Sequence, residues 1–159
     1  MTTTTPTSSV SHDTFVIERT YEATVSRVFG AWADPVRKAR WFAGSADALN
    51  NGYSLDFVVG GHEINRGGPP DGPIYAFDAE YRDIVVDQRI VTTYEMYVGD
   101  DRMSVSVATV EFTEVDGGTR LVLTEQGVFL DGHDTSAQRE EGTRAMVESL
   151  ARALEAGEV

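Results

Sequence analysis

The segment from Arg19 to Phe42, RTYEATVSRVFGAWADPVRKARWF, decides how the first part of the chain folds. Thr24 can cap a helix that ends at Ala33, because a threonine hydroxyl accepts a hydrogen bond from a free amide in the first turn. The apolar residues that recur on one stripe of this helix are Val25, Val28, Phe29 and Trp32. Asp34-Pro35 ends it and can begin a second helix over 35–41, since proline suits the first helical turn.

Alternating apolar and polar residues on both sides of this segment predict β-strands. One strand is expected over Thr14–Thr20, before the helices, and six more are expected after them. The six later strands are predicted over Tyr53–Val59, His62–Arg66, Ile74–Val86, Arg89–Tyr97, Met103–Glu114 and Thr119–Gly127. In Met103–Glu114 the apolar phase slips between Val107 and Ala108, which indicates a β-bulge.

The end of the chain predicts one long amphipathic helix, which Asp134 or Ser136 can cap and Gly157 can terminate. The order of elements predicts the α+β class. We expect a curved antiparallel sheet of about seven strands wrapped on the long C-terminal helix, with two short helices after the first strand. A cavity between such a sheet and such a helix is a favoured site for a small molecule.

The chain of 159 residues fits one domain. We expect residues 1–13, MTTTTPTSSVSHD, to form a disordered polar tail and residues 14–156 to form a single domain. The tail lacks the basic start and apolar core of a secretory signal. No stretch of the sequence is apolar enough for a membrane span, so the expected location is cytoplasmic.

Charge and cysteine content exclude several classes of function. The 26 acidic and 13 basic side chains give a net charge of -13, so the sequence offers no basic patch for nucleic acid or for an anionic membrane surface. The chain has no cysteine, which excludes disulfides, thiolate catalysis and cysteine-ligated metals. Of the basic residues only Lys38 is a lysine. Many of the arginines can therefore pair with carboxylates within the fold.

The Arg19–Phe42 segment resembles the opening of the activator of heat-shock-protein-90 ATPase homology family. The family pattern R-x-(F/Y)-x-A-x-x-x-x-V-F-x-A-W-x-D-P, with a later W-(W/F) pair, falls on Arg19, Tyr21, Ala23, Val28, Phe29, Ala31, Trp32, Asp34, Pro35, Trp41 and Phe42. Further family motifs match Gly60-Gly61, Tyr81–Ile84, Asp87–Val91, Val110–Glu114, Gly118–Leu121 and Glu141-Gly142. The resemblance covers residues 14–155 and implies the helix-grip fold of the START-like, or SRPBCC, superfamily.

The resemblance also implies an apolar cavity beneath the long helix, and the chain departs from the family pattern at positions expected there. Thr143 stands where the family has a tryptophan. Glu63 stands where the family has an aromatic residue, and Asn65 follows it on the same strand face. Ala79 replaces an expected glycine. We therefore expect a cavity that is roomier and more polar than is usual in the family.

Two glutamates are candidate catalytic acid–base groups. If Glu63 and Asn65 face inward, they could bind a polar ligand, or Glu63 could act as a base. The alternative is an edge strand with Glu63 in solvent. Glu125 alternates with Leu121 and Leu123 and should share their inward face, where it could meet an arginine or a ligand. Its alternative is a structural ion pair or the frayed end of a strand.

Aromatic side chains extend the candidate ligand site, although plain core packing is an equal explanation for them. The candidate ligand-binding residues are Trp41, Phe42, Phe57, Glu63, Asn65, Tyr75, Phe77, Tyr81, Tyr94, Met96, Thr143 and Met146. Three scattered histidines show no metal-ligand spacing, so we expect no metal site and no cofactor.

The function that the sequence favours is binding of a small hydrophobic or amphipathic molecule in the cavity, more than catalysis. One alternative is an enzyme of polyketide-cyclase or hydrolase type that uses a pocket glutamate. A second is activation of a chaperone ATPase, although the eukaryotic activators carry an additional domain for which this chain has no room. A third is resistance to a natural product by sequestration. The sequence leaves open a homodimer, with Trp32 and Trp41 at an interface or in the core.

Overall fold

A computed structural model describes residues 7–159 and contains seven strands, three α-helices and one 3-10 helix. The strands are β1 (Val10–Tyr21), β2 (Tyr53–Leu55), β3 (His62–Gly67), β4 (Tyr75–Val85), β5 (Arg89–Val98), β6 (Asp101–Val115) and β7 (Gly118–Leu130). The helices are α1 (Val25–Ala33), α2 (Pro35–Phe42), the 3-10 helix η1 (Ala46–Asn50) and α3 (Ser136–Glu155). This element order confirms the predicted α+β class.

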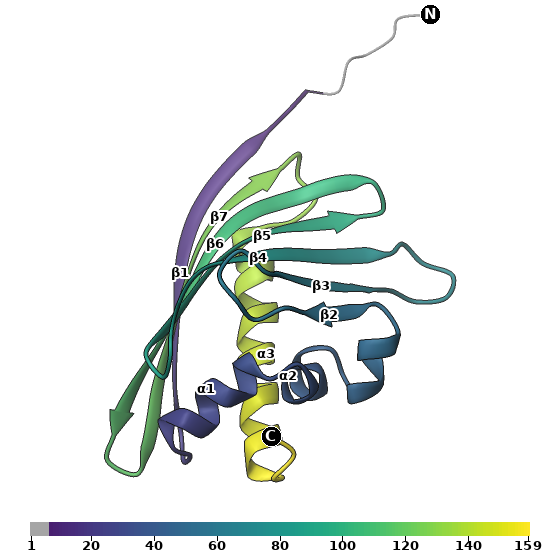
Figure 1. Ribbon diagram of the computed structural model, residues 1–159. Coiled ribbons are helices and arrows are strands. Elements are labelled where there is room, and N and C mark those ends of the chain that lie inside the picture. The colour runs from purple at the N-terminus through teal and green to yellow at the C-terminus, as the bar shows by residue number, and fades with distance from the viewer. Residues whose placement is uncertain (1–6) are drawn as a thin grey trace, which may run out of the picture.

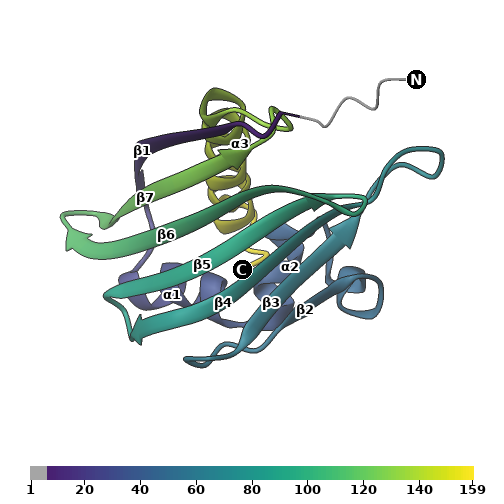
Figure 2. The same ribbon diagram turned by 90° about the horizontal axis from the view of Figure 1, so that it is seen from above.

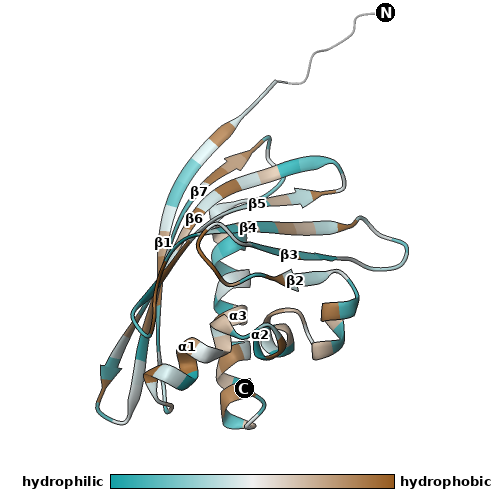
Figure 3. Cartoon of the chain, viewed as in Figure 1, coloured by the Kyte–Doolittle hydropathy of each residue, from teal (hydrophilic) through white to brown (hydrophobic). Residues whose placement is uncertain are grey.

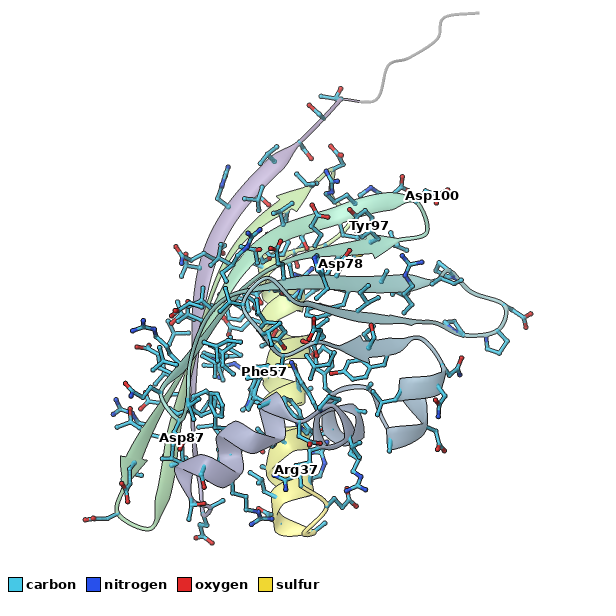
Figure 4. The ribbon with its side chains drawn as sticks, viewed as in Figure 1. Arg37, Phe57, Asp78, Asp87, Tyr97 and Asp100 are labelled. Atoms are coloured by element: carbon cyan, nitrogen blue, oxygen red, sulfur yellow. The ribbon has the colours of Figure 1, made fainter. Side chains whose placement is uncertain are left out.

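The seven strands form one antiparallel sheet in the order β1-β7-β6-β5-β4-β3-β2. Figure 2 shows this order from above, with the first strand beside the last one. The sheet curves around α3, while α1 and α2 cover its lower end (Figure 1). Asp87 and Asp100 mark turns at opposite ends of the sheet in Figure 4, as expected for consecutive hairpins. The chain therefore has the predicted helix-grip architecture.

Side-chain caps fix where the helices begin. Thr24 Oγ1 accepts a hydrogen bond from the Arg27 amide at the start of α1, and the Asp34 carboxylate accepts one from the Arg37 amide at the start of α2. At α3 the prediction was wrong by one residue, since Thr135 is the cap. The predicted alternative Asp134 instead pairs with a side chain of the candidate site.

The core lies between the lower part of the sheet, α1 and the C-terminal half of α3. Phe29 packs edge-to-face on Phe112, and Trp32 packs in the same way on Trp41. Most buried residues of α3 belong to its C-terminal half, namely Val147, Leu150, Ala151, Ala153 and Leu154. Figure 3 shows this half as the more apolar one. The N-terminal half of α3 therefore contributes little to the apolar core.

The N-terminal strand is longer than predicted. β1 begins at Val10, four residues before the expected start, because its first residues pair with the end of β7, Val10 with Leu130 and Asp13 with Gly127. The proposed tail over 1–13 is therefore too long at its C-terminal end, and its residues 1–6 lie outside the described residues. β2 is shorter than predicted, since only Tyr53–Leu55 pairs with β3.

The predicted bulge between Val107 and Ala108 is wrong, since β5 and β6 pair there without a shift. The register shifts lie instead between Tyr81 and Asp83 and between Met96 and Tyr97. The apolar phase changes because the upper part of β6 turns polar side chains inward, with Ser104 and Ser106 buried and Val105 and Val107 exposed. Inward serines are unusual for a core and indicate a polar region under this part of the sheet.

None of the helices in the described part of the chain combines the length and the apolar composition needed to cross a membrane.

Gly118 should tolerate no side chain, because an added Cβ atom would lie 1.9 Å from the Tyr21 carbonyl oxygen. We expect Gly118→Ala to lower the free energy of unfolding by at least about 2 kcal/mol, since the obstacle is backbone that cannot rotate away. Gly67→Ala is the matched control, because its Cβ meets nothing within 4 Å. Urea unfolding of both variants measures the difference, and equal stabilities would contradict the close approach.

Candidate functional site

A cavity of about 400 Å³ lies between the inner face of the sheet and the N-terminal half of α3. Its apolar wall consists of Trp32, Phe42, Phe77, Ile90, Met96, Val110, Leu123 and Met146. Polar and charged side chains from α2, β3, β5, β7 and α3 complete the lining. The volume and the mixture of apolar walls with a few polar groups are those of a small-molecule site.

The structure brings most of the predicted site residues to this cavity. Those that line it are Phe42, Glu63, Asn65, Phe77, Tyr81, Tyr94, Met96, Glu125, Thr143 and Met146. The expected shared inward face of Glu125 with Leu121 and Leu123 is confirmed, and of the two alternatives for Glu63 the structure shows the inward one. That these residues bind a ligand stays a prediction.

Three predicted residues lie elsewhere. Trp41 is part of the core, where its Nε1 donates a hydrogen bond to the Ala31 carbonyl oxygen at 2.8 Å. Phe57 packs edge-to-face on Phe29 and on Tyr81, and Figure 4 shows it in the interior near α1. Tyr75 is exposed at the start of β4. For Trp41 and Phe57 the alternative of plain core packing was the correct one.

One end of the cavity holds a buried ion pair between Lys38 on α2 and Glu63 on β3. The Lys38 Nζ atom lies 2.7 Å from Glu63 Oε1, and the two side chains are 4% and 1% exposed. Two tyrosines also donate to this carboxylate, Tyr81 to Oε1 at 2.9 Å and Tyr53 to Oε2 at 2.6 Å. We call these four residues the Lys38 cluster. The alternative of a solvated Glu63 is wrong.

Aromatic rings surround the Lys38 ammonium and compensate part of its lost hydration. Its Nζ atom lies 4.8 Å from the ring centroid of Phe42 and 5.0 Å from that of Trp32. Both oxygens of Glu63 are engaged, so this carboxylate is held as a structural acceptor. Burial raises the pKa of Tyr81 and of Tyr53, and the adjacent Glu63 charge raises both further, so both tyrosines remain donors at neutral pH.

The other end of the cavity holds Glu125 on β7, Tyr94 on β5 and Arg139 on α3, together with Asp134 and Ser104. Tyr94 OH donates to Glu125 Oε1 at 2.5 Å, and Arg139 Nη1 donates to Tyr94 OH at 2.9 Å. Arg139 Nη2 donates to Ser104 Oγ and to Asp134 Oδ2, each at 2.8 Å. We call these five residues the Glu125 cluster. The hydrogen bond from Arg139 explains why β6 turns Ser104 inward.

Glu125 differs from Glu63 because one of its oxygens is not engaged. Glu125 Oε2 is buried and accepts no hydrogen bond from any residue in 7–159, and its nearest cation is Arg139 Nη1 at 3.8 Å. Burial raises the pKa of this carboxyl above its ordinary value of 4.5, which the Tyr94 hydroxyl and the Arg139 charge oppose. Trp32 Nε1, from a second lining residue, is also buried without a partner among these residues.

Sequence reasoning missed two residues that organise the site, Lys38 and Arg139. Arg139 precedes Thr143 and Met146 at helical spacing, so extending that stripe by one turn would have found it. One feature of the sequence set Lys38 apart. It is the only lysine of the chain, and it lies within the helix predicted over 35–41. Among the described residues no group of three or more histidine or acidic side chains could hold a metal ion.

Removal of the Lys38 ammonium should be costly, because it leaves the Glu63 carboxylate buried without a cation. We expect Lys38→Met to lower the free energy of unfolding by about 3–5 kcal/mol. The double variant Lys38→Met/Glu63→Gln should regain most of this loss, since glutamine is neutral, its oxygen accepts from one of the two tyrosines and its amide nitrogen can donate to the hydroxyl of the other. The exposed pair Arg144–Glu140 provides the control, and Arg144→Met should cost under about 1 kcal/mol. Similar losses for Lys38→Met and Arg144→Met would contradict the burial of the pair.

The raised pKa of Glu125 predicts a specific pH dependence of stability. A carboxyl whose pKa is higher in the folded state binds protons more tightly there, so its contribution to stability is lost as the pH rises above 4.5. Relative to Glu125→Gln, the free energy of unfolding of the wild type should fall by up to about 1.4 kcal/mol for each unit that the pH rises, until it passes the pKa of Glu125 in the folded state. Urea unfolding at several pH values measures this. A difference that stays constant or grows with pH would refute it, and the exposed Glu114→Gln is the control.

Comparison with known proteins assigns the chain to a family. The family model "Activator of Hsp90 ATPase homolog 1-like protein" matches residues 22–155. A search of curated proteins finds no match.

Several solved structures share the fold of this chain. An uncharacterised protein of Rhizobium leguminosarum is 44% identical over 94% of this chain and 98% of its own, with a TM-score of 0.88. The Mll3558 protein of Rhizobium loti is 49% identical over 91% of this chain and 98% of its own, with a TM-score of 0.84. DynU16, a protein in the dynemicin biosynthetic locus, is 26% identical over 91% of this chain but only 48% of its own, with a TM-score of 0.66. The chain belongs to the activator of Hsp90 ATPase homology family, within the START-like, or SRPBCC, superfamily.

Proposed function

We propose that this protein binds a small amphipathic molecule in the cavity between its sheet and α3. The observation that carries the proposal is the cavity itself, about 400 Å³ with a mainly apolar wall and a hydrogen-bonded cluster at each end. A well-packed interior leaves few voids larger than a water molecule, so a space of this size supports a binding function. The apolar wall would hold the body of the ligand and the polar clusters would orient it.

The two polar clusters favour a binding site over a packing defect as the explanation of the cavity. Each places a carboxylate that is at least nine-tenths buried against tyrosine donors and a basic side chain. Such networks are costly to bury and rigid once satisfied, and they hold the walls of the cavity apart. The relative DynU16 is a protein in a locus for dynemicin biosynthesis, which is in keeping with a natural product as one class of ligand.

A second candidate function is acid–base catalysis, which one observation favours. Of the two glutamates proposed from the sequence, Glu63 is fully engaged, whereas Glu125 has a free Oε2 and a raised pKa. A buried carboxyl with a raised pKa and a free oxygen is suited to exchange a proton with a ligand. If a ligand found in the cavity is converted, the rate should follow a pH limb that disappears in Glu125→Gln. Chaperone activation, a cytoplasmic location and a homodimer remain predictions from the sequence.

Native mass spectrometry of freshly purified protein tests the binding proposal without a prior choice of ligand. We expect extra mass that is lost on denaturation, and its identity would give the ligand class directly. If only the bare chain mass is found, the neutral fluorescent probe N-phenyl-1-naphthylamine provides the second test. Its emission should rise on mixing with the protein, because a probe of this size enters an apolar cavity.

The variant Gly142→Leu should block the cavity without unfolding the protein. Gly142 lines the cavity on α3, and a Cβ atom there would meet nothing within 4 Å. Leucine also has the higher helix propensity, so stability should not fall. We expect the affinity for N-phenyl-1-naphthylamine to drop at least about tenfold.

Ala145→Leu is the matched control, since it adds a leucine to an exposed position of α3 outside the lining. It should leave probe binding unchanged. Probe binding that is equal in both variants would place the probe outside the cavity and contradict the proposal.

A further inference from the structure

The cavity lining contains more acidic than basic side chains. Its lining contains three carboxylates, Glu63, Glu125 and Asp134, but only two basic side chains, Lys38 and Arg139. Lys38 is paired with Glu63 at 2.7 Å, and Arg139 is paired with Asp134 at 2.8 Å. Glu125 is the carboxylate that remains, with Arg139 no closer than 3.8 Å. In its ionised form the cavity therefore carries one uncompensated negative charge.

The free oxygen of Glu125 is placed to receive a donor from a ligand. Glu125 is 3% exposed, its Oε1 accepts from Tyr94, and no residue in 7–159 donates to Oε2. Arg139 cannot readily turn to it, because its two terminal nitrogens already donate to Tyr94, Ser104 and Asp134. A buried acceptor without a donor costs free energy, and a ligand that supplies the donor recovers it.

Resting on the binding function proposed above, we infer that the cavity selects an amphipathic amine whose protonated nitrogen donates to Glu125 Oε2. The ammonium group supplies both the missing donor and the missing positive charge. The apolar body of the amine then lies along the wall that Phe77, Met96 and Met146 provide. An anionic ligand would find no unpaired cation in the cavity lining, because Lys38 and Arg139 are each already paired with a carboxylate.

Two further features favour a cation over a neutral alcohol. The Phe77 ring lies near the Glu125 carboxylate, with its centroid 4.9 Å from that of Tyr94, and the Tyr94 ring itself already has a cation over it, the Arg139 guanidinium at 5.5 Å. Aromatic faces attract organic cations, most strongly where water is excluded. The chain as a whole carries a net charge of -13, which raises the local concentration of cations and lowers that of anions.

Three probes with one naphthalene skeleton test the inference at neutral pH: 1-naphthylmethylamine, 1-naphthalenemethanol and 1-naphthoic acid. Displacement of N-phenyl-1-naphthylamine gives the three affinities in the full chain. We expect the amine to bind at least about tenfold more tightly than the alcohol, and the acid to bind most weakly. An alcohol or acid that matches or exceeds the amine would overturn the inference. Binding of none of the three would instead count against the cavity function itself.

Glu125→Gln should remove the preference for the amine, reducing its affinity to that of the alcohol while leaving alcohol binding within about threefold. Glu155→Gln makes the same change of net charge at an exposed position of α3 and should preserve the preference. An amine preference that survives in Glu125→Gln would overturn the assignment to this carboxylate.

If Glu125→Gln does not fold, the wild type provides the test through its pH dependence. The groups that face Glu125 are Tyr94 on β5, Arg139 on α3 and Asp134 before α3. Protonation of Glu125 removes the charge, so amine affinity should fall as the pH is lowered from neutral into the acid range, whereas alcohol affinity should not. Amine and alcohol affinities that change in parallel would contradict the inference.

Discussion

The division of α3 into two halves is the constraint on which the rest of the structure depends. Its C-terminal half buries Val147, Leu150 and Leu154 against the sheet and α1, which fixes the helix in place. Its N-terminal half carries Arg139 and Thr143 on the same face, where Arg139 makes polar contacts with the sheet through Tyr94 and Ser104. The sheet curves around the helix (Figure 1), and the cavity lies between the sheet and the polar half of α3.

Two buried polar clusters hold that space open. The Lys38 cluster connects α2 with β2, β3 and β4, and the Glu125 cluster connects α3 with β5, β6 and β7. A collapsed cavity would have to separate a buried ammonium from its carboxylate, or a buried guanidinium from three oxygen partners. Such a rearrangement would leave buried charged and polar groups without partners, which opposes collapse of the cavity.

Much of this structure can be predicted from the sequence, because the strongest patterns are local. Caps, strand alternation and the Arg19–Phe42 motif give the element order, and alternation gives the inward face of Glu125 but leaves that of Glu63 open. The sequence does not show that Lys38 meets Glu63 or that Arg139 meets Tyr94. These contacts join residues 25 and 45 positions apart, and they depend on how far the sheet bends. The predicted bulge failed for the same reason, since alternation cannot distinguish a slipped register from serines that are buried on the inner face.

The functional difference between the two glutamates is likewise a tertiary property. Both lie on strands and both face inward, but one has three donors and the other has a free oxygen. The two ends of the cavity therefore differ. In the Lys38 cluster both carboxylate oxygens are engaged, whereas in the Glu125 cluster one carboxylate oxygen is free to accept from a ligand. A ligand with one polar terminus and an apolar body fits this arrangement better than a symmetric one.

The most direct test of the cavity as the binding site is an NMR measurement on protein with ¹³C-labelled methionine methyl groups. The chain has four methionines, of which Met96 and Met146 line the cavity, while Met103 is buried outside it. With N-phenyl-1-naphthylamine bound, the account predicts nuclear Overhauser effects from the probe to Met96 and Met146 and none to Met103. Contacts to neither Met96 nor Met146 in a protein that binds the probe would contradict it.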